Sequence, residues 1–242
     1  MVNDGANNSN LAVAVISVTA TNDAPVITVD PSAAYVENAA AVVLAPTAAL
    51  SDVDDTELHG ALVSITAGSF PGDGDILSVG GVTSNTVNGI TFTWMPAQHA
   101  LVFSGASSVA NYQALLQQVQ FQSSSDNPTD FSHSPQRTLT WAVTDSASVT
   151  TATTTINIVA VNDAPEETVA ATAAYTENGS PVTISPAATA SDVDNSDLIY
   201  GEVRIVAGGF DGDVLTVNGL QSGTFARHRL FLRCRLAAPS VQ

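Results

Sequence analysis

The sequence predicts an all-β fold in which two sheets pack face to face, with one short helix added. Strands are indicated by alternating side chains: Leu139, Trp141 and Val143 alternate with Thr and Ala, so one face of this segment is apolar. β-branched residues dominate such segments, as is usual in strands. Segments rich in turn-forming residues separate the strands at 31–32, 71–75 and 125–135. Short strands divided by turns are typical of a β-sandwich.

One segment departs from this pattern. Its apolar residues recur at intervals of three or four, the spacing of one helix face, at Val109, Tyr112, Leu115, Leu116 and Val119. We therefore expect a short helix near 107–118. It should cover one edge of the sandwich and have a structural role only.

Composition and charge narrow the possible functions. The 242 residues include 23 acidic side chains against 6 basic ones, all of them Arg, which gives a formal net charge of −17. This excess of carboxylates repels nucleic acids and anionic membranes, so neither is an expected partner. The lone cysteine excludes a disulfide scaffold, and no apolar run is long enough to span a bilayer. The first residues lack the features of a secretion signal, so we expect either a cytosolic protein or an export signal elsewhere on a longer parent.

An internal repeat organises the chain. Three motifs return at one constant offset in the numbering: Asn22–Pro25 as Asn162–Pro165, Tyr35–Asn38 as Tyr175–Asn178, and Ser51–Asp54 as Ser191–Asp194. A single offset shared by several motifs indicates tandem repetition. The sequence therefore predicts that residues 1–21 are the C-terminal strand of a preceding repeat, that 22–161 form a complete repeat, and that 162–226 begin a second, truncated one.

Oxygen-bearing side chains recur at fixed places in this repeat. Asp52 and Asp54 project to the same side of an extended chain, because side chains two positions apart share a face. Two carboxylates held this close repel one another unless a cation lies between them or one is protonated. Ligand sets of oxygen without His or Cys suit Ca²⁺ better than Zn²⁺ or Cu²⁺. A solvated acidic turn would explain one such motif, but its recurrence favours a metal site.

The order of the motifs resembles that of cadherin repeats. The Glu-Asn pair stands near the start of the unit, Ser-Asp-Val-Asp in the middle, Trp141–Asp145 near the end, and Asn-Asp-Ala-Pro in the linker. Residues 1–226 resemble most closely the cadherin-like, Ig-like repeats of very large bacterial surface adhesins. This resemblance implies export by type I secretion and joints made rigid by Ca²⁺. Animal cadherins usually carry an acid where this chain has Ala20 and Ala160, so one or two ions per joint are expected rather than three.

The resemblance also assigns ligands to two joints. At the joint after the complete repeat they are Glu37, Asn162, Asp163, Asp192 and Asp194. At the joint before it they are Asn22, Asp23, Asp52, Asp54 and Asp145, with the Glu of the preceding repeat missing.

These features together predict a non-enzymatic structural repeat of a secreted adhesin at the cell surface. Its partners would be the neighbouring repeats and a cell-surface or matrix target, with Ca²⁺ clamping each joint into an extended stalk. The alternative is a carbohydrate-binding or spacer β-sandwich module of an extracellular enzyme. That module would expose an aromatic platform, whereas Trp141, one of only two Trp residues, lies on an apolar strand face. A third possibility, an enzyme fragment, lacks any visible catalytic motif.

The last segment, 227–242, has a different composition. It contains four Arg and no acid, whereas residues 1–226 hold all 23 acids and the other two Arg. After Phe70 and Phe210 the offset between the repeats shortens by two, so a strand like Gly89–Trp94 should begin at 227. We interpret the basic tail as the product of a frameshift, with a genuine basic tail as the alternative.

This interpretation predicts what the encoding DNA contains. Moving the frame forward by one base permits Gly at position 227, followed by Ile or Thr, Asp, Phe, Ser and Tyr, which suits a Gly-Ile-x-Phe-x-aromatic strand. Sequencing the gene should show such a strand in the shifted frame. Any other sequence there would contradict the frameshift.

Overall fold

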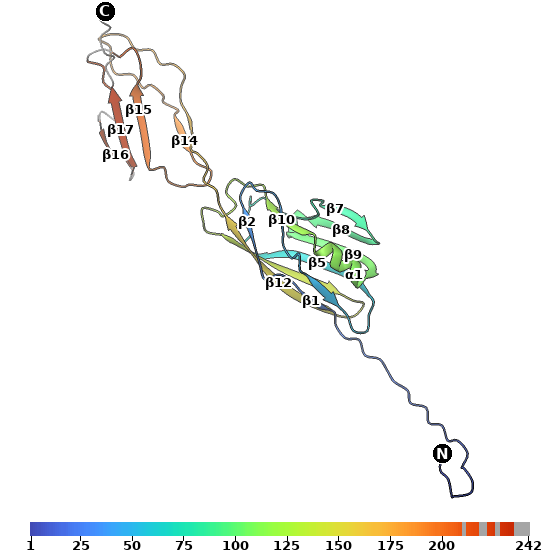
Figure 1. Cartoon of the computed structure of the whole chain (residues 1–242). Coiled ribbons are helices and arrows are strands. Elements are labelled where there is room, and N and C mark those ends of the chain that lie inside the picture. Colours follow the sequence, from blue (N-terminus) through green and yellow to red (C-terminus); the bar gives the residue numbers. More distant parts are fainter. Residues whose placement is uncertain (210–211, 218–221, 226–227, 235–242) are drawn as a thin grey trace, which may run out of the picture.

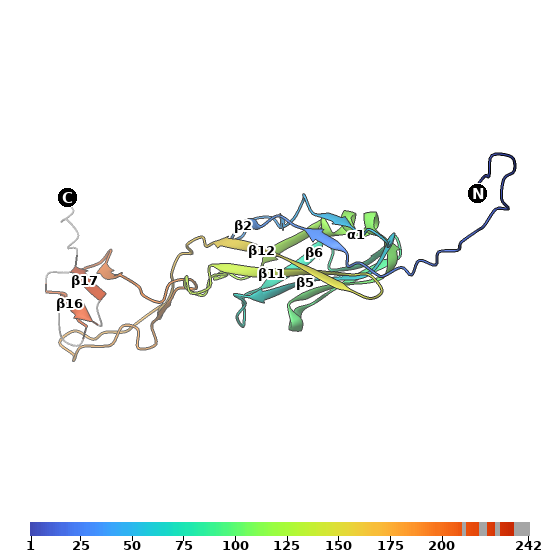
Figure 2. The ribbon, with the colours of Figure 1, turned by 90° about the horizontal axis from the view of Figure 1, so that it is seen from below.

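The computed structural model describes residues 1–209, 212–217, 222–225 and 228–234, the last two segments as backbone only. It is mostly β-sheet with one short α-helix, which confirms that part of the predicted fold class. A central body of packed strands lies between an extended N-terminal segment and a smaller group of C-terminal strands (Figure 1). The extended N-terminal segment and the C-terminal strands lie on opposite sides of this body in both views (Figures 1 and 2).

The central body is built from short strands and a few longer ones. The strands are β1 (Val26–Thr28), β2 (Ser32–Val36), β3 (Val42–Val43), β4 (Ala49–Ser51), β5 (Glu57–Ala67), β6 (Asp75–Val79), β7 (Ser84–Val87), β8 (Ile90–Met95), β9 (Ala100–Ser108), β10 (Val119–Ser123), β11 (Gln136–Thr144) and β12 (Val149–Val159). A single 3₁₀ turn, η1 (Pro96–Gln98), connects β8 to β9.

These strands form two sheets and a ribbon. The large sheet has seven strands in the order β2-β12-β11-β5-β9-β8-β7, the small sheet has the order β3-β10-β6, and β1 pairs with β4. Strand β2 runs parallel to β12, whereas the other pairs of the large sheet are antiparallel. This parallel pair matters for the site described below, because it fixes where the chain leaves β2.

One hydrophobic core joins the two sheets. Leu77 and Phe121 of the small sheet belong to the same buried cluster as Phe103 and Trp141 of the large sheet. The apolar face of β11 lies in the core, as its alternating sequence predicts. Trp141 is fully buried, and its indole Nε1 donates a 3.0 Å hydrogen bond to Thr154 Oγ1 on β12. Each large apolar side chain buried in this way contributes roughly 1.5–3 kcal/mol. The arrangement is consistent with a two-sheet sandwich.

The predicted helix is present as α1 (Val109–Leu116). Ser108 caps its N-terminus, with Oγ accepting a 3.3 Å hydrogen bond from the Asn111 amide. The helical spacing places Tyr112, Leu115 and Leu116 in the core, so this segment packs against the sandwich as expected. Among the described residues, no helix combines the length and apolarity that crossing a bilayer requires.

Five strands of the described structure follow the linker, and the first three of them are almost entirely exposed. The five are β13 (Glu166–Thr168), β14 (Thr189–Ser191), β15 (Tyr200–Ile205), β16 (Ser222–Phe225) and β17 (His228–Cys234). The β13–β14 ribbon repeats the register of β1–β4 at the same offset as the motifs, since Val26 pairs with Ser51 and Glu166 with Ser191. Part of the basic tail forms β17, beside β15 and β16, while residues 227 and 235–242 of that tail lie outside the described residues.

Within residues 1–21, which we expected to form the C-terminal strand of a preceding repeat, the segment Leu11–Val18 is not a strand. This segment is extended without ladder hydrogen bonds, and its apolar side chains are exposed, with Val15 at 88% and Ile16 at 85%. A strand exists only through its neighbours, because its backbone groups need partners. In the described structure no other strand lies beside this segment, so its sequence pattern alone does not produce a sheet.

The core position of α1 leads to a stability prediction. Leu116 is 1% exposed, so the Leu116→Ala variant should leave a cavity and lose about 2–5 kcal/mol of unfolding free energy. Leu62 on β5 is 36% exposed and serves as a matched control, for which Leu62→Ala should cost about 1 kcal/mol or less. Urea unfolding of both variants measures the difference, and equal losses would contradict the assigned core.

Candidate metal centres

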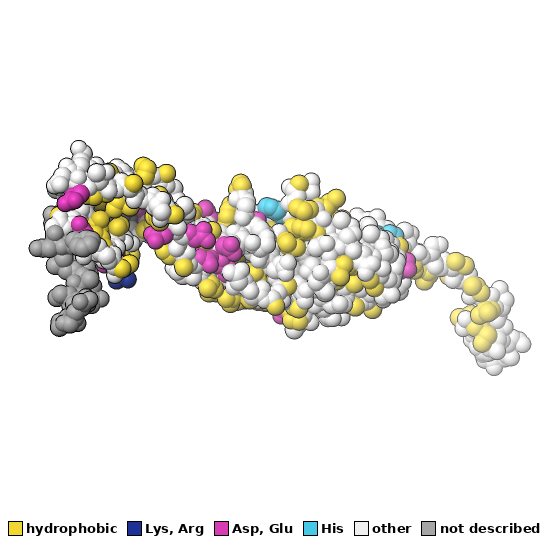
Figure 3. Space-filling model, turned by 90° about the horizontal axis from the view of Figure 1, so that it is seen from above, with side chains coloured by type: hydrophobic (Ala, Val, Ile, Leu, Met, Phe, Trp, Pro, Cys, Tyr) yellow, Lys and Arg dark blue, Asp and Glu magenta, His cyan; other side chains and the backbone are white. Residues whose placement is uncertain are grey.

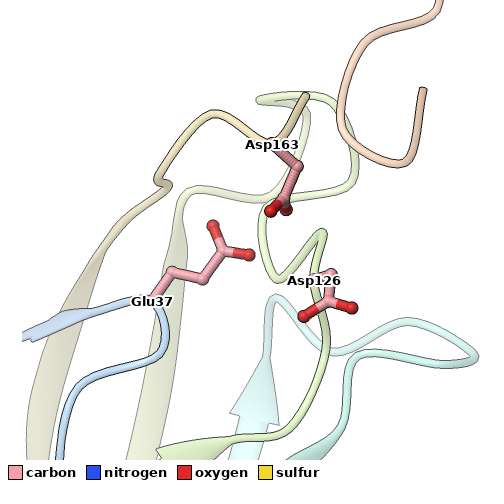
Figure 4. Close-up of side chains that lie close together, drawn as sticks. All are labelled: Glu37, Asp126 and Asp163. Carbon is pink, nitrogen blue, oxygen red and sulfur yellow. The ribbon is translucent and has the colours of Figure 1, made fainter. Parts of the chain in front are cut away.

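Two acidic clusters lie at opposite ends of the β11–β12 pair. The first, which we call the C-terminal cluster, consists of Glu37, Asp126 and Asp163 (Figure 4). One carboxylate oxygen from each lies within 4.8 Å of the others. Acidic side chains gather on the surface where the central body meets the C-terminal strands (Figure 3).

Three separate segments supply this cluster. Glu37 directly follows β2, Asp126 lies in the loop between β10 and β11, and Asp163 lies in the linker after β12. The parallel pairing of Val36 with Val159 carries Glu37 to the end of β12 where the linker starts. The pairing of β2 with β12 therefore brings together segments that lie far apart in the sequence.

Glu37 is held in place by the linker backbone. Its amide donates a 3.0 Å hydrogen bond to the carbonyl of Val159, and its Oε2 accepts a 2.7 Å hydrogen bond from the amide of Val161. The residue is 3% exposed, and its other oxygen, Oε1, has no hydrogen-bond partner among the described residues. A carboxylate buried with one unpaired oxygen is costly unless a cation neutralises it.

The electrostatics of the cluster also make a bound cation favourable. Burial raises the pKa of Glu37, and the negative charges of Asp163, Asp194 and Asp126 raise it further. Asp163 Oδ2 is also buried without a hydrogen-bond partner in the described structure. Two oxygens bound on opposite sides of a Ca²⁺ ion lie about 4.6–5.2 Å apart, so carboxylate oxygens within 4.8 Å of one another are close enough to share one hard divalent cation.

The linker is also bonded to the segment that follows it. The amide of Asp163 donates a 3.2 Å hydrogen bond to Asp194 Oδ2. Asn162 Oδ1 accepts from Asn195 Nδ2 at 3.1 Å, and Asp192 Oδ1 accepts from the amides of Asp194 and Asn195. The predicted set is thus divided. Asp163 joins Glu37, and Asp194 binds the linker backbone. Asn162 lies in the linker and accepts from Asn195, whereas Asp192 lies in the adjoining turn outside the cluster.

The second group, the N-terminal cluster, consists of Asp52, Asp55 and Asp145, again with one oxygen of each within 4.8 Å of the others. Asp145 is 2% exposed at the β11–β12 turn, where its Oδ1 accepts 2.6 Å hydrogen bonds from the amides of Ala147 and Ser148. These bonds lower the pKa of Asp145, so the cluster holds an ionised carboxylate. Asp52 Oδ2 is buried and lacks a hydrogen-bond partner in the described part of the chain.

The other predicted residues at this end contact the cluster or the linker. Asn22 Nδ2 donates a 3.0 Å hydrogen bond to Asp145 Oδ2, and the amide of Asp23 donates a 3.1 Å hydrogen bond to Asp54 Oδ2. Asp54 therefore faces the linker backbone, as its counterpart Asp194 does in the second repeat, and the carboxylate of Asp23 does not belong to the cluster. Of the predicted N-terminal set, Asp52 and Asp145 are brought together.

Sequence reasoning missed two members, Asp126 and Asp55. Asp55 had a readable signal, because it directly follows the Asp-x-Asp motif of Asp52 and Asp54. In the structure the amides of Asp54 and Asp55 both donate to Asp52 Oδ1, a tight turn that places Asp55 beside it. Asp126 had only a weak signal, its place in a turn-rich loop, because no recurring motif contains it and its exact position is set by the fold.

No protein-family model matches this chain, and no curated protein has a significant match to it.

The raised pKa of Glu37 leads to a pH prediction. Glu37→Gln keeps an acceptor for the Val161 amide but removes the buried charge. A carboxyl group whose pKa is raised on folding stabilises the protein at low pH and loses that contribution as the pH rises through the raised value. In EDTA at pH 7, E37Q should therefore melt above the wild type, and the difference should shrink towards pH 5.

Thermal melting followed by circular dichroism measures this difference. Asp75, whose pKa burial raises to about 7, titrates in both proteins and does not enter the comparison. The matched control is Glu177→Gln, because Glu177 is the counterpart of Glu37 in the second repeat and is exposed. An E37Q variant that melts below the wild type at pH 7 in EDTA would contradict the prediction.

Proposed function

We propose that this chain is a calcium-dependent structural region of a secreted surface adhesin, in which Ca²⁺ fixes the joints between successive β-sandwich repeats. The single observation that carries the proposal is Glu37. It is a buried carboxylate with an unpaired oxygen, it lies against Asp163 of the linker, and the linker amide of Val161 binds it. A cation at this point would tie the central body to its own exit segment.

Calcium is favoured by the chemistry of the ligands. Both clusters consist of carboxylates, with no His or Cys among their members. Oxygen ligands on separate loops suit the flexible coordination of Ca²⁺, whereas Mg²⁺ needs near-ideal octahedral geometry. With three carboxylates in a cluster, we expect a dissociation constant of about 10⁻⁴–10⁻³ M, the range of extracellular modules.

Recurring contacts support the tandem-repeat part of the proposal. The Asp23–Asp54 hydrogen bond of 3.1 Å has a counterpart of 3.2 Å between Asp163 and Asp194. The turn at Asp145 also has a counterpart, since Asp4 Oδ1 accepts from the amides two and three positions later. Similar local bonding at equivalent places is what tandem repeats joined end to end should have.

The proposed mechanism is mechanical. Without a cation, the carboxylates of Glu37, Asp126 and Asp163 repel one another and the linker is held only by backbone hydrogen bonds. With Ca²⁺ bound, the linker is clamped to the central body on one side, while the amide of Asp163 binds Asp194 on the other. A series of such joints makes a stiff stalk that holds a distal adhesive domain away from a cell surface.

The alternative, a carbohydrate-binding module, has less support. Such a module stacks sugars on exposed aromatic rings, but Trp141 is fully buried and Trp94 is partly buried against the core. These two are the only Trp residues of the chain.

Calcium titration tests the proposal. In the full chain, Ca²⁺ at about ten times its dissociation constant should stabilise the fold by about 1.4 kcal/mol per site, and Mg²⁺ should stabilise it less. Asp126→Asn should weaken the C-terminal cluster and Asp52→Asn the N-terminal one, each removing part of the heat measured by calorimetry. The matched control is Asp130→Asn, in the same loop as Asp126 but outside both clusters. No calcium uptake by the wild type would falsify the proposed function.

A further inference from the structure

Arg137 is a buried cation close to the C-terminal cluster but not part of it. It is the only basic residue between 22 and 161 other than His, and it lies fully buried on β11. Its guanidinium meets the buried carboxylate of Asp75, with Nε–Oδ2 at 2.5 Å and Nη2–Oδ1 at 3.4 Å, and it stacks 5.3 Å above the ring centre of Phe70.

The remaining guanidinium donors bind the loop between β10 and β11 and the first residue of β11. Nη2 donates to the carbonyl of Pro128 at 2.8 Å, and Nη1 donates to the carbonyls of Ser134 at 2.9 Å and Gln136 at 3.4 Å. With the two bonds to Asp75, these contacts use all the N–H groups of an arginine. Pro128 and Ser134 lie on either side of the loop's turn, and Asp126 stands two positions before Pro128.

A second set of contacts holds the same loop from the other side. Ser123 Oγ donates to the carbonyl of Asp73 at 2.7 Å, and the amide of Ser124 donates to the carbonyl of Gly74 at 3.0 Å. The amide of Asn127 then donates to Ser125 Oγ at 3.1 Å. The backbone is therefore fixed before and after Asp126, by the Asp73–Asp75 turn and by Arg137, which are themselves joined through the ion pair.

We propose that Arg137 is a positioning residue for the C-terminal cation site: through Pro128 and Ser134 it fixes the loop that presents Asp126 to Glu37 and Asp163. This inference rests on the proposed function. A buried ion pair is not needed for stability, since apolar residues of similar volume often serve as well. An apolar side chain, however, offers no donors to two loop carbonyls. Residues that orient metal ligands in this way typically change metal affinity about 10–100-fold when replaced.

The test compares the two clusters within one molecule. Calcium is titrated into the full ¹⁵N-labelled chain, and amide shifts of Asn127 and Asp163 report the C-terminal cluster while those of Asp54 and Ala147 report the N-terminal one. Arg137→Lys keeps the charge but lacks the planar fork of donors. It should raise the calcium dissociation constant of the C-terminal cluster about tenfold or more and leave that of the N-terminal cluster within about twofold.

A second variant keeps the test decisive if R137K does not fold. Ser125→Ala removes the hydrogen bond to the Asn127 amide without touching the buried ion pair, and it should weaken the C-terminal cluster alone by several-fold. Unchanged affinity at both clusters, or an equal loss at both, would overturn the positioning role of Arg137. A wild type without any calcium response would overturn the proposed function itself, and this inference with it.

Discussion

Repulsion between carboxylates at the linker is the constraint on which the rest of the structure depends. Glu37 is almost fully buried beside Asp126 and Asp163, and its pKa is raised by burial and by those negative charges. The buried charge of Asp75, by contrast, is neutralised within the chain by Arg137. At the linker no basic residue of the described chain takes that role, so the cluster is suited to a charge supplied from solution.

The sheet topology explains how these residues meet. The large sheet ends with β2 beside β12 in parallel, so the two strands leave the sheet at the same end. Glu37 and the linker are therefore neighbours although 124 positions separate Glu37 from Val161. The antiparallel β11–β12 pair sends Asp145 to the other end. The body thus has an acidic cluster at each place where the chain enters or leaves it.

Much of the fold could be predicted from the sequence, because local patterns determine it. The alternation of Leu139, Trp141 and Val143 gave β11, and the helical spacing of Tyr112, Leu115 and Leu116 gave α1. The residues of the site could be predicted only where they belong to motifs that recur in the sequence. Glu37, Asp52 and Asp145 stand in motifs, whereas Asp126 owes its place to a loop held by distant contacts. The segment Leu11–Val18 has the residue pattern of a strand but does not form one, because no other strand of the described structure lies beside it.

The short β1–β4 ribbon has a consequence for tension along the chain. A pulling force on the two linkers acts on the central body at β1 and at β12. Strand β1 has three paired residues, whereas β12 has eleven residues and is paired on both sides, with β11 and with β2. The load on the N-terminal side is carried by few hydrogen bonds, while that on the C-terminal side is shared along the longest strands. Mechanical extension should therefore begin by detaching β1, leaving the large sheet and the Glu37 end intact.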